Sequence, residues 1–126
     1  MCNLENLKFV EINGMHVYNM TLHDITYISN QGKFIFPGNK EACVRVSQDY
    51  VSVEHPLGLN TEKKAGKKTV TGLPDYKEGI FYLVSGLVRD QLPERKDLLA
   101  PSQNVEHQIK NDKGHTVAVT FIETNL

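Results

Sequence analysis

The chain has 126 residues, of which 40% are hydrophobic and 23% charged, as in an ordinary soluble globular domain. Its formal net charge of −1 excludes a basic field that would draw it onto long nucleic acid or an anionic membrane, so a bound anion must sit in a local pocket. No apolar run approaches the ~20 residues of a membrane helix, and residues 1–12 lack the pattern of a signal peptide. We therefore expect one cytoplasmic domain over residues 1–126.

Reactive and metal-binding residues are sparse. The two cysteines, Cys2 and Cys43, are too few for a disulfide scaffold and favour a reducing compartment. The five histidines are scattered singly, without the close spacing of a structural zinc site, so we expect no metal. The sequence has no phosphate-binding glycine loop and no GxSxG elbow, so we expect no cofactor, and none of its fifteen carboxylates are paired at a recognisable catalytic spacing.

The first third of the chain has the pattern of β-hairpins. Asn13-Gly14 separates two apolar-rich stretches within residues 7–20, and this pair favours a tight hairpin turn because both residues tolerate positive φ. Residues 24–36 repeat the pattern around Asn30-Gln31-Gly32. Alternating side chains in residues 42–47 and 50–54 predict further strand.

Residues 55–68 (HPLGLNTEKKAGKK) combine proline, glycine and four lysines with little apolar content. This composition predicts a mobile lysine-rich loop or hairpin tip. Two interpretations stay open: a solvated loop, or a cationic lid over an anion site. Strand pattern resumes at residues 68–72.

The stretch 79–85 (GIFYLVS) is almost continuously apolar, as in a central strand covered on both faces. Ser85 is a suitable N-cap for a short helix that Pro93 ends. A last hairpin is predicted at residues 111–114. The fold class we predict is mainly β, an antiparallel sheet of about seven to nine strands with one short helix, whose edges favour a homo-oligomer.

An anion site is one interpretation of the segment after this strand. Backbone N–H groups at the helix start attract phosphate, and Arg89 and Arg95 can donate two hydrogen bonds each to its oxygens. Tyr82 can offer a ring face to a nucleobase. The alternatives are core packing for Tyr82 and a surface ion pair between Arg95 and Asp97.

Three motifs resemble those of a family of small phage and prophage proteins. They are Asn19-Met20-Thr21-Leu22-His23, Val44-Arg45-Val46, and the run YLVSGLVRDQLPERKDL at residues 82–98. The family that this pattern resembles is the phage anti-defence sponges directed against Thoeris immunity. Such proteins sequester cyclic ADP-ribose isomers, and some also bind cyclic oligonucleotides at a second site and form symmetric oligomers.

The resemblance implies a protein that binds a cyclic nucleotide signal without cleaving it, in the cytosol of an infected host, as a dimer or hexamer. The ligand-binding residues expected from the motifs and from the segment above are Asn19, His23, Arg45, Tyr82, Ser85, Arg89, Arg95 and Asp97. Arg89 stands where the family pattern has alanine, and Leu22 where it has proline. Two alternatives remain: a phage structural or interaction module with no small-molecule site, and an enzyme that degrades a nucleotide.

Overall fold

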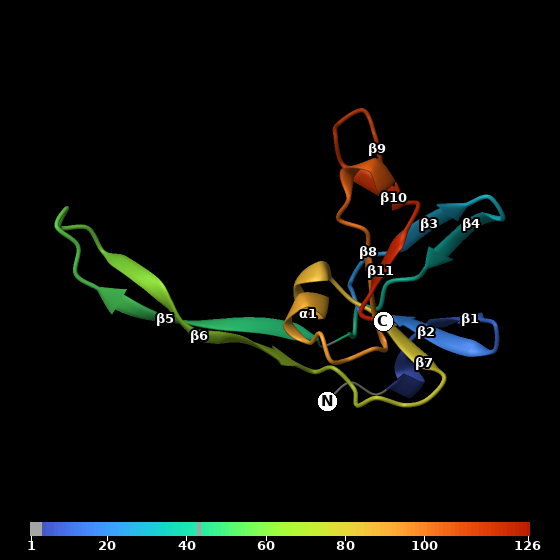
Figure 1. The fold of residues 1–126 in the computed structure, drawn as a ribbon, viewed down its shortest axis with the longest axis horizontal. Helices are drawn as coiled ribbons and strands as arrows, with labels where there is room; N and C mark the ends of the chain where they lie inside the picture. The colour runs from blue at the N-terminus through green and yellow to red at the C-terminus, as the bar shows by residue number, and fades with distance from the viewer. Residues whose placement is uncertain (1–3, 43) are drawn as a thin grey trace.

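The structure is a computed structural model that describes residues 4–42 and 44–126. Within these ranges, eleven strands form sheets of five, four and two strands, and the one α-helix is α1 (Gly86–Gln91) (Figure 1). No helix in the described residues has the length and apolar character needed to span a bilayer. The two cysteines, Cys2 and Cys43, lie outside the described residues.

The strands have the following bounds. They are β1 (Phe9–Ile12), β2 (Met15–Asn19), β3 (Ile25–Ser29), β4 (Gly32–Phe36), β5 (Arg45–Val53), β6 (Thr61–Thr71), β7 (Ile80–Leu83), β8 (Leu98–Pro101), β9 (Gln108–Lys110), β10 (Thr116–Val119) and β11 (Ile122–Thr124). Two 3-10 turns, at Leu4–Asn6 and Val105–His107, complete the secondary structure of the described chain.

The five-stranded sheet has the order β1-β2-β7-β8-β11, so β7 is its central strand, as its continuous apolar sequence predicts. The inner pairs β2–β7 and β7–β8 are parallel, whereas the outer pairs are antiparallel. Two hydrophobic clusters cover β7. One contains Tyr82 and Leu98, and the other contains Leu83 and Phe36.

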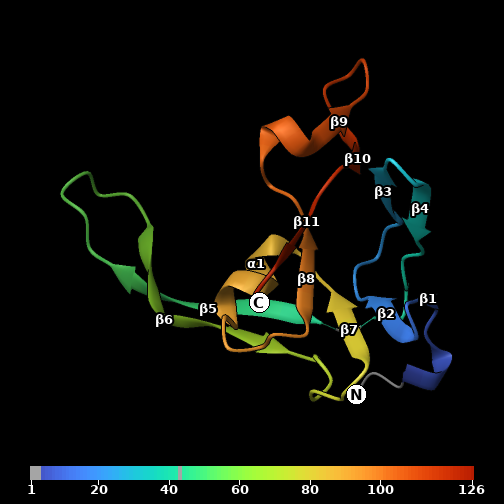
Figure 2. The same cartoon turned by 45° about the vertical axis from the view of Figure 1, so that its right-hand side comes forward.

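The four-stranded sheet has the order β4-β3-β10-β9, with β3 and β10 parallel. Figure 2 shows this sheet extending away from the five-stranded sheet. One of its faces begins at Ile25 and Phe36, which pack into the cluster around Leu83. The other face turns away from that cluster.

The β5–β6 hairpin, residues 45–71, forms the two-stranded ribbon that projects from the rest of the molecule in Figures 1 and 2. Val46 and Val70 anchor its base against the core cluster around Tyr82. Midway along the ribbon the strand register shifts at Gln48, between Ser47 and Asp49. The Gln48 side-chain amide donates to the carbonyls of Asp49, Ala65 and Gly66 at this point, where the regular ladder is interrupted.

The loop or hairpin tip expected at residues 55–68 is confirmed as a hairpin tip over residues 55–60 and is wrong over residues 61–68, which belong to β6. The lysines misled the sequence interpretation. A strand of a ribbon exposed on both faces needs no apolar face, and lysine is common on unpaired sheet edges.

Both N-terminal hairpins are confirmed. Asn13 (φ 53°) and Gly14 (φ 79°) form the turn between β1 and β2, and both have the positive φ that a primed turn requires. The second hairpin joins β3 and β4 through Asn30-Gln31.

The expectation of one antiparallel sheet is wrong. The structure is mainly β with one helix, but its strands form three sheets, two of which are mixed. Local turn signals identify hairpins between sequence neighbours. The parallel pairs join strands that are distant in sequence, such as β2 and β7, and no local pattern reports them.

Candidate functional site

Arg95 and Asp97 form an ion pair just before the start of β8. Arg95 Nε and Nη2 donate to the two Asp97 carboxylate oxygens at 2.9 and 2.8 Å, and Nη2 also donates to the Pro74 carbonyl at 2.9 Å. The Asp97 side chain is 1% exposed and that of Arg95 is 20% exposed. The hydrogen bond to Asp97 raises the pKa of the Arg95 guanidinium. The guanidinium is held in place by its bonds to the Asp97 carboxylate and the Pro74 carbonyl.

Tyr82 lies beside this pair and is fully buried, with 0% of its surface exposed. Its backbone N–H donates to the Asp97 carbonyl at 2.9 Å, and its ring packs near Tyr18 with centroids 6.2 Å apart. Burial raises the pKa of the phenol above its ordinary value, and the Asp97 charge adds to that shift. In this structure the ring presents no face to a ligand, which corrects the expectation of a stacking platform.

Ser85 is the N-cap of α1, as predicted. Its backbone is extended (φ −67°, ψ 156°) and its hydroxyl accepts from the Val88 N–H at 3.3 Å. The helix has six residues, and Leu92 ends it before Pro93. Ser85 thus supplies a hydrogen bond that the helix start needs, and this accounts for its position in the motif.

Arg89 is held by the C-terminal strand. Its guanidinium pairs with Glu123 of β11 and with Asp90, and donates to Asn125 Oδ1 at 3.0 Å. Asn125 Nδ2 in turn donates to the carbonyls of Arg89, Leu92 and Arg95. The Arg89 carbonyl lies in the last turn of α1 and the Leu92 carbonyl at its C-cap, and each also accepts a backbone N–H, from Leu92 and from Arg95. Asn125 therefore adds a second hydrogen bond to the carbonyls at this end of the helix.

Sequence reasoning missed Glu123 and Asn125. They lie 34 and 36 residues from Arg89, and no motif connects them to it. The one signal in the sequence was chemical: the Arg89 guanidinium needs acceptors, and the polar residues near the C-terminus can supply them. The structure shows that the helix and the chain end stabilise each other.

Asn19 belongs to a separate polar cluster at the end of β2. Its side chain donates to the carbonyls of His23 and Phe36, each at 2.8 Å, and accepts from the N–H and hydroxyl of Thr21. Asn39 donates to the Asn19 carbonyl at 2.8 Å. The first motif is thus a folded loop in which Asn19 is buried, while the His23 side chain is exposed.

Arg45 begins β5 where the ribbon leaves the body, and it is exposed. Its Nη1 donates to the carbonyls of Ala42 and Val44 at 3.3 and 2.9 Å. Among the described residues Arg45 forms no ion pair, in contrast to Arg89 and Arg95.

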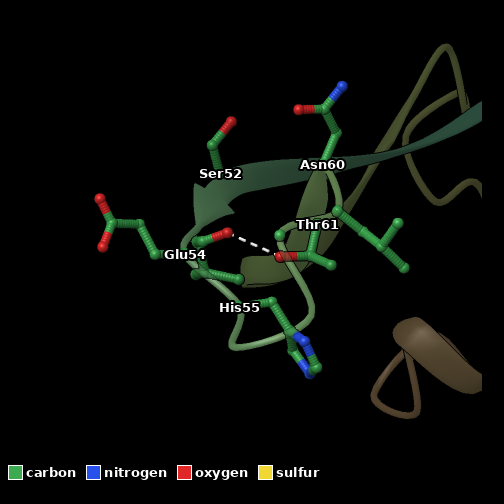
Figure 3. Close-up of a pocket in the computed structure, with 8 residues that line it drawn as sticks. Ser52, Glu54, His55, Asn60 and Thr61 are labelled. Atoms are coloured by element: carbon green, nitrogen blue, oxygen red, sulfur yellow. Dashed lines mark hydrogen bonds between the residues drawn. The ribbon is translucent and has the colours of Figure 1, made fainter.

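A hollow of about 460 Å³ lies at the ribbon tip and is drawn in Figure 3. Thr61 closes one side by donating its hydroxyl to the Val53 carbonyl at 2.6 Å. His55 Nδ1 accepts from the Leu57 N–H at 3.1 Å. The labelled side chains of Glu54, His55 and Asn60 point in different directions. They therefore do not converge on one point, as the polar groups of a small-molecule site do.

The eight expected ligand residues therefore occupy five places. Tyr82, Arg95 and Asp97 form one cluster and Asn19 and His23 another, whereas Arg89 joins the C-terminal strand, Ser85 caps the helix and Arg45 stands at the ribbon base. The structure brings together Tyr82, Arg95 and Asp97. The Arg95 guanidinium and the Asp97 carboxylate bind each other and the Tyr82 N–H donates to the Asp97 carbonyl, while the Tyr82 hydroxyl has no hydrogen-bond partner among the described residues.

Comparisons with protein-family models, with curated proteins and with solved structures each found no match. The resemblance to anti-defence sponges thus stays a prediction based on the three motifs. Function has to be argued from the surfaces that the fold leaves uncovered.

Proposed function

We propose that this protein is a non-catalytic binding module that functions as a homo-oligomer, with its ribbon and its four-stranded sheet as association surfaces. The observation that carries the proposal is the exposed area. The chain exposes 8873 Å². A compact monomer of 14.2 kDa exposes about 6,800 Å² by the usual scaling with mass.

The excess is roughly 2,000 Å² per chain and so roughly 4,000 Å² for two chains, which falls in the range of permanent interfaces, about 2,000–5,000 Å² in total. It comes from apolar as well as polar side chains. Large exposed apolar residues occur on the ribbon (Tyr50, Val51, Leu57 and Leu59) and on the four-stranded sheet (Phe34, Ile35, Ile109 and Val117). Exposed apolar surface beyond what an ordinary monomer shows marks interaction sites.

The ribbon is also too thin to be stable by itself. Two-stranded hairpins without a packed face are marginal in water, and both edges of this one carry unpaired backbone groups. Covering the ribbon with another chain removes both problems.

Light scattering on the eluting protein tests the proposal directly. We expect a mass that is a multiple of 14.2 kDa at micromolar concentration. A mass of 14.2 kDa at every concentration would contradict it.

A second candidate is sequestration of a cyclic nucleotide, the activity that the motif resemblance implies. The observation that favours it is Arg45, an exposed guanidinium that forms no ion pair among the described residues and so is available to a phosphate. A pocket completed between subunits would add further contacts.

A thermal melt against cyclic ADP-ribose, its glycosidic isomers and cyclic di- and trinucleotides tests this candidate. A ligand at 100 times its Kd stabilises the protein by about 2.7 kcal/mol, which raises Tm by several degrees. Arg45→Ala should abolish the shift and leave the ligand-free melt unchanged, whereas Lys96→Ala, a matched exposed cation, should keep it. A flat panel would count against this candidate, and chemically altered ligand would indicate an enzyme.

A further inference from the structure

We infer that the ribbon of one copy packs on the outer face of the four-stranded sheet of a second copy. This rests on the proposed function and identifies the two surfaces that meet. The "outer face" here means the row Ile35, Thr26, Ala118 and Ile109, with Ile28 beside it.

The outer face is a continuous row across all four strands. Ile35 pairs with Thr26, and Ala118 pairs with Ile109, while the β3–β10 register places Ala118 next to Thr26. Side chains at directly opposed positions share one face of a sheet. Ile35 is 48% and Ile109 38% exposed, so the row ends in uncovered apolar groups on both edge strands.

The opposite face of this sheet is already used. Ile25, Tyr27 and Phe36 alternate with the outer-face residues and pack against the cluster around Leu83. The outer face is therefore the side on which a further layer can be added. An apolar face of a sheet is stable when another element packs on it.

The ribbon carries apolar side chains on one of its sides, here called the strip. Val51 and Val53 lie there opposite Lys63 and Thr61 of β6, and Leu59 lines the hollow that Val53 and Thr61 also border. Leu57 in the same tip is 71% exposed. A two-stranded ribbon of this length can lie across a four-stranded sheet and cover its row of apolar side chains.

Charge selects between the possible arrangements. Residues 45–71 carry five basic and three acidic side chains, a net charge of +2, whereas the whole chain carries −1. The rest of the molecule therefore carries −3. Two ribbons would repel each other, while a ribbon and the body of a second copy attract.

The partner has to be another molecule because the two surfaces cannot meet within one chain. Figures 1 and 2 show the ribbon tip and the β3–β4 hairpin at opposite ends of the molecule. Reciprocal exchange of ribbons closes a two-fold dimer and covers both surfaces on both copies. The excess area of each chain is sufficient for such an interface.

Complementation between two variants tests the pairing without knowledge of its register. The ribbon variant carries Val51→Thr, Leu57→Ser and Leu59→Ser. The sheet variant carries Ile35→Thr and Ile109→Thr, which keep strand-forming side chains but remove the apolar contact. The matched control carries Leu22→Ser and Tyr76→Ser. These substitutions also remove exposed apolar side chains, but the two residues lie outside both the ribbon and the outer face.

We expect the wild type and the control to have the dimer mass by light scattering, and each variant alone to have the monomer mass. An equimolar mixture of the two variants should regain dimer, because the ribbon of the sheet variant fits the sheet of the ribbon variant. Circular dichroism melts confirm that both variants are folded. If the sheet variant does not fold, Ile35→Thr alone replaces it.

The other outcomes separate this inference from the proposed function. A dimeric sheet variant shows that ribbons pair with ribbons, and a dimeric ribbon variant shows that sheets pair with sheets; either overturns the inference but not the homo-oligomer. A mixture that stays monomeric beside a dimeric wild type also overturns it. A monomeric wild type overturns both, and if that monomer shifts a labelled DNA or RNA duplex, the lysine-bearing ribbon binds nucleic acid instead.

Discussion

The segment around β7 and the β5–β6 ribbon use their side chains in opposite ways. In the first, Tyr82 and Asp97 are buried, Arg95 is bound to Asp97, and Arg89 is bound to Glu123 of β11. In the second, tyrosine, valine and leucine side chains lie in solvent beside lysines, and neither edge is paired. The comparison separates a region that completes its own interactions from one that needs a partner.

The motif that suggested a ligand site is thus accounted for by the fold. Ser85 starts the helix, Asn125 adds hydrogen bonds at its end, and Asp97 neutralises Arg95. Residues that hold a core together can produce as specific a pattern as residues that hold a ligand. The uncovered surfaces, which produce no motif, are where we locate function.

The largest effect should come from breaking the buried ion pair. Asp97→Asn leaves Arg95 without its charged partner, and removal of one member of a buried pair costs about 3–5 kcal/mol. Urea unfolding measures the loss. Asp90→Asn is the control, because Asp90 is 63% exposed and should change the free energy of unfolding by less than about 1 kcal/mol. Equal effects would contradict the burial argument.

A second prediction concerns the contact between two loops. A Cβ on Gly38 would lie 2.6 Å from the backbone carbon of His23, so Gly38→Ala forces the loops apart. We expect a loss of about 1–3 kcal/mol in the same unfolding experiment. Gly86→Ala, which meets only the flexible Gln103 side chain at 3.5 Å, should cost less. The reverse order would show that the two loops do not pack as described.

Removing the helix cap should have a smaller effect. Ser85→Ala deletes the acceptor for the Val88 N–H and should cost about 1 kcal/mol. Ser85→Asp retains an acceptor and should recover most of the loss. If the alanine variant instead kept full stability but lost the response to a cyclic nucleotide, Ser85 would be a ligand contact.

Tyr82→Phe should be nearly neutral at pH 7, because the Tyr82 hydroxyl is buried with no hydrogen-bond partner among the described residues. At alkaline pH the two proteins should differ. The pKa of Tyr82 is higher in the folded state than its unfolded value of 10.0. The contribution of Tyr82 to the free energy of unfolding is therefore fully present below pH 10.0 and is lost as the pH rises above that value. Unfolding measured from pH 8 upward should show the wild type losing stability faster than the phenylalanine variant. Parallel curves would contradict the assignment.

The smallest effect on folding should come from the ribbon. Val51→Thr with Leu59→Ser should change the free energy of unfolding of the monomer by less than about 0.5 kcal/mol, because these side chains bury little surface within one chain. Guanidinium unfolding at low protein concentration measures this. A loss as large as that of a core substitution would show that the strip packs against its own chain.

The sequence predicted the features that depend on neighbouring residues. The Asn13-Gly14 turn, the Ser85 cap and the central position of residues 80–83 are all confirmed. Each depends on backbone preference or local hydropathy, and both of these can be read from a short segment of sequence.

The features that the sequence did not predict depend on contacts across the chain. The parallel pairs of β7, the strand β8 and the partners of Arg89 join segments separated by many residues. Residues 61–68 of the ribbon were mistaken for a loop because the stability of the ribbon does not come from an apolar face of its own. The stacking role expected of Tyr82 was wrong for a related reason, since a tyrosine has the same sequence pattern whether it faces a ligand or is buried in the core.

The most direct test of the account is the mass of the wild-type protein in solution beside that of the ribbon variant, measured by light scattering on the same column. The account predicts twice 14.2 kDa for the wild type and 14.2 kDa for the ribbon variant, with identical circular dichroism spectra. A wild type that stays at 14.2 kDa would show that the exposed ribbon and sheet are not surfaces of self-association.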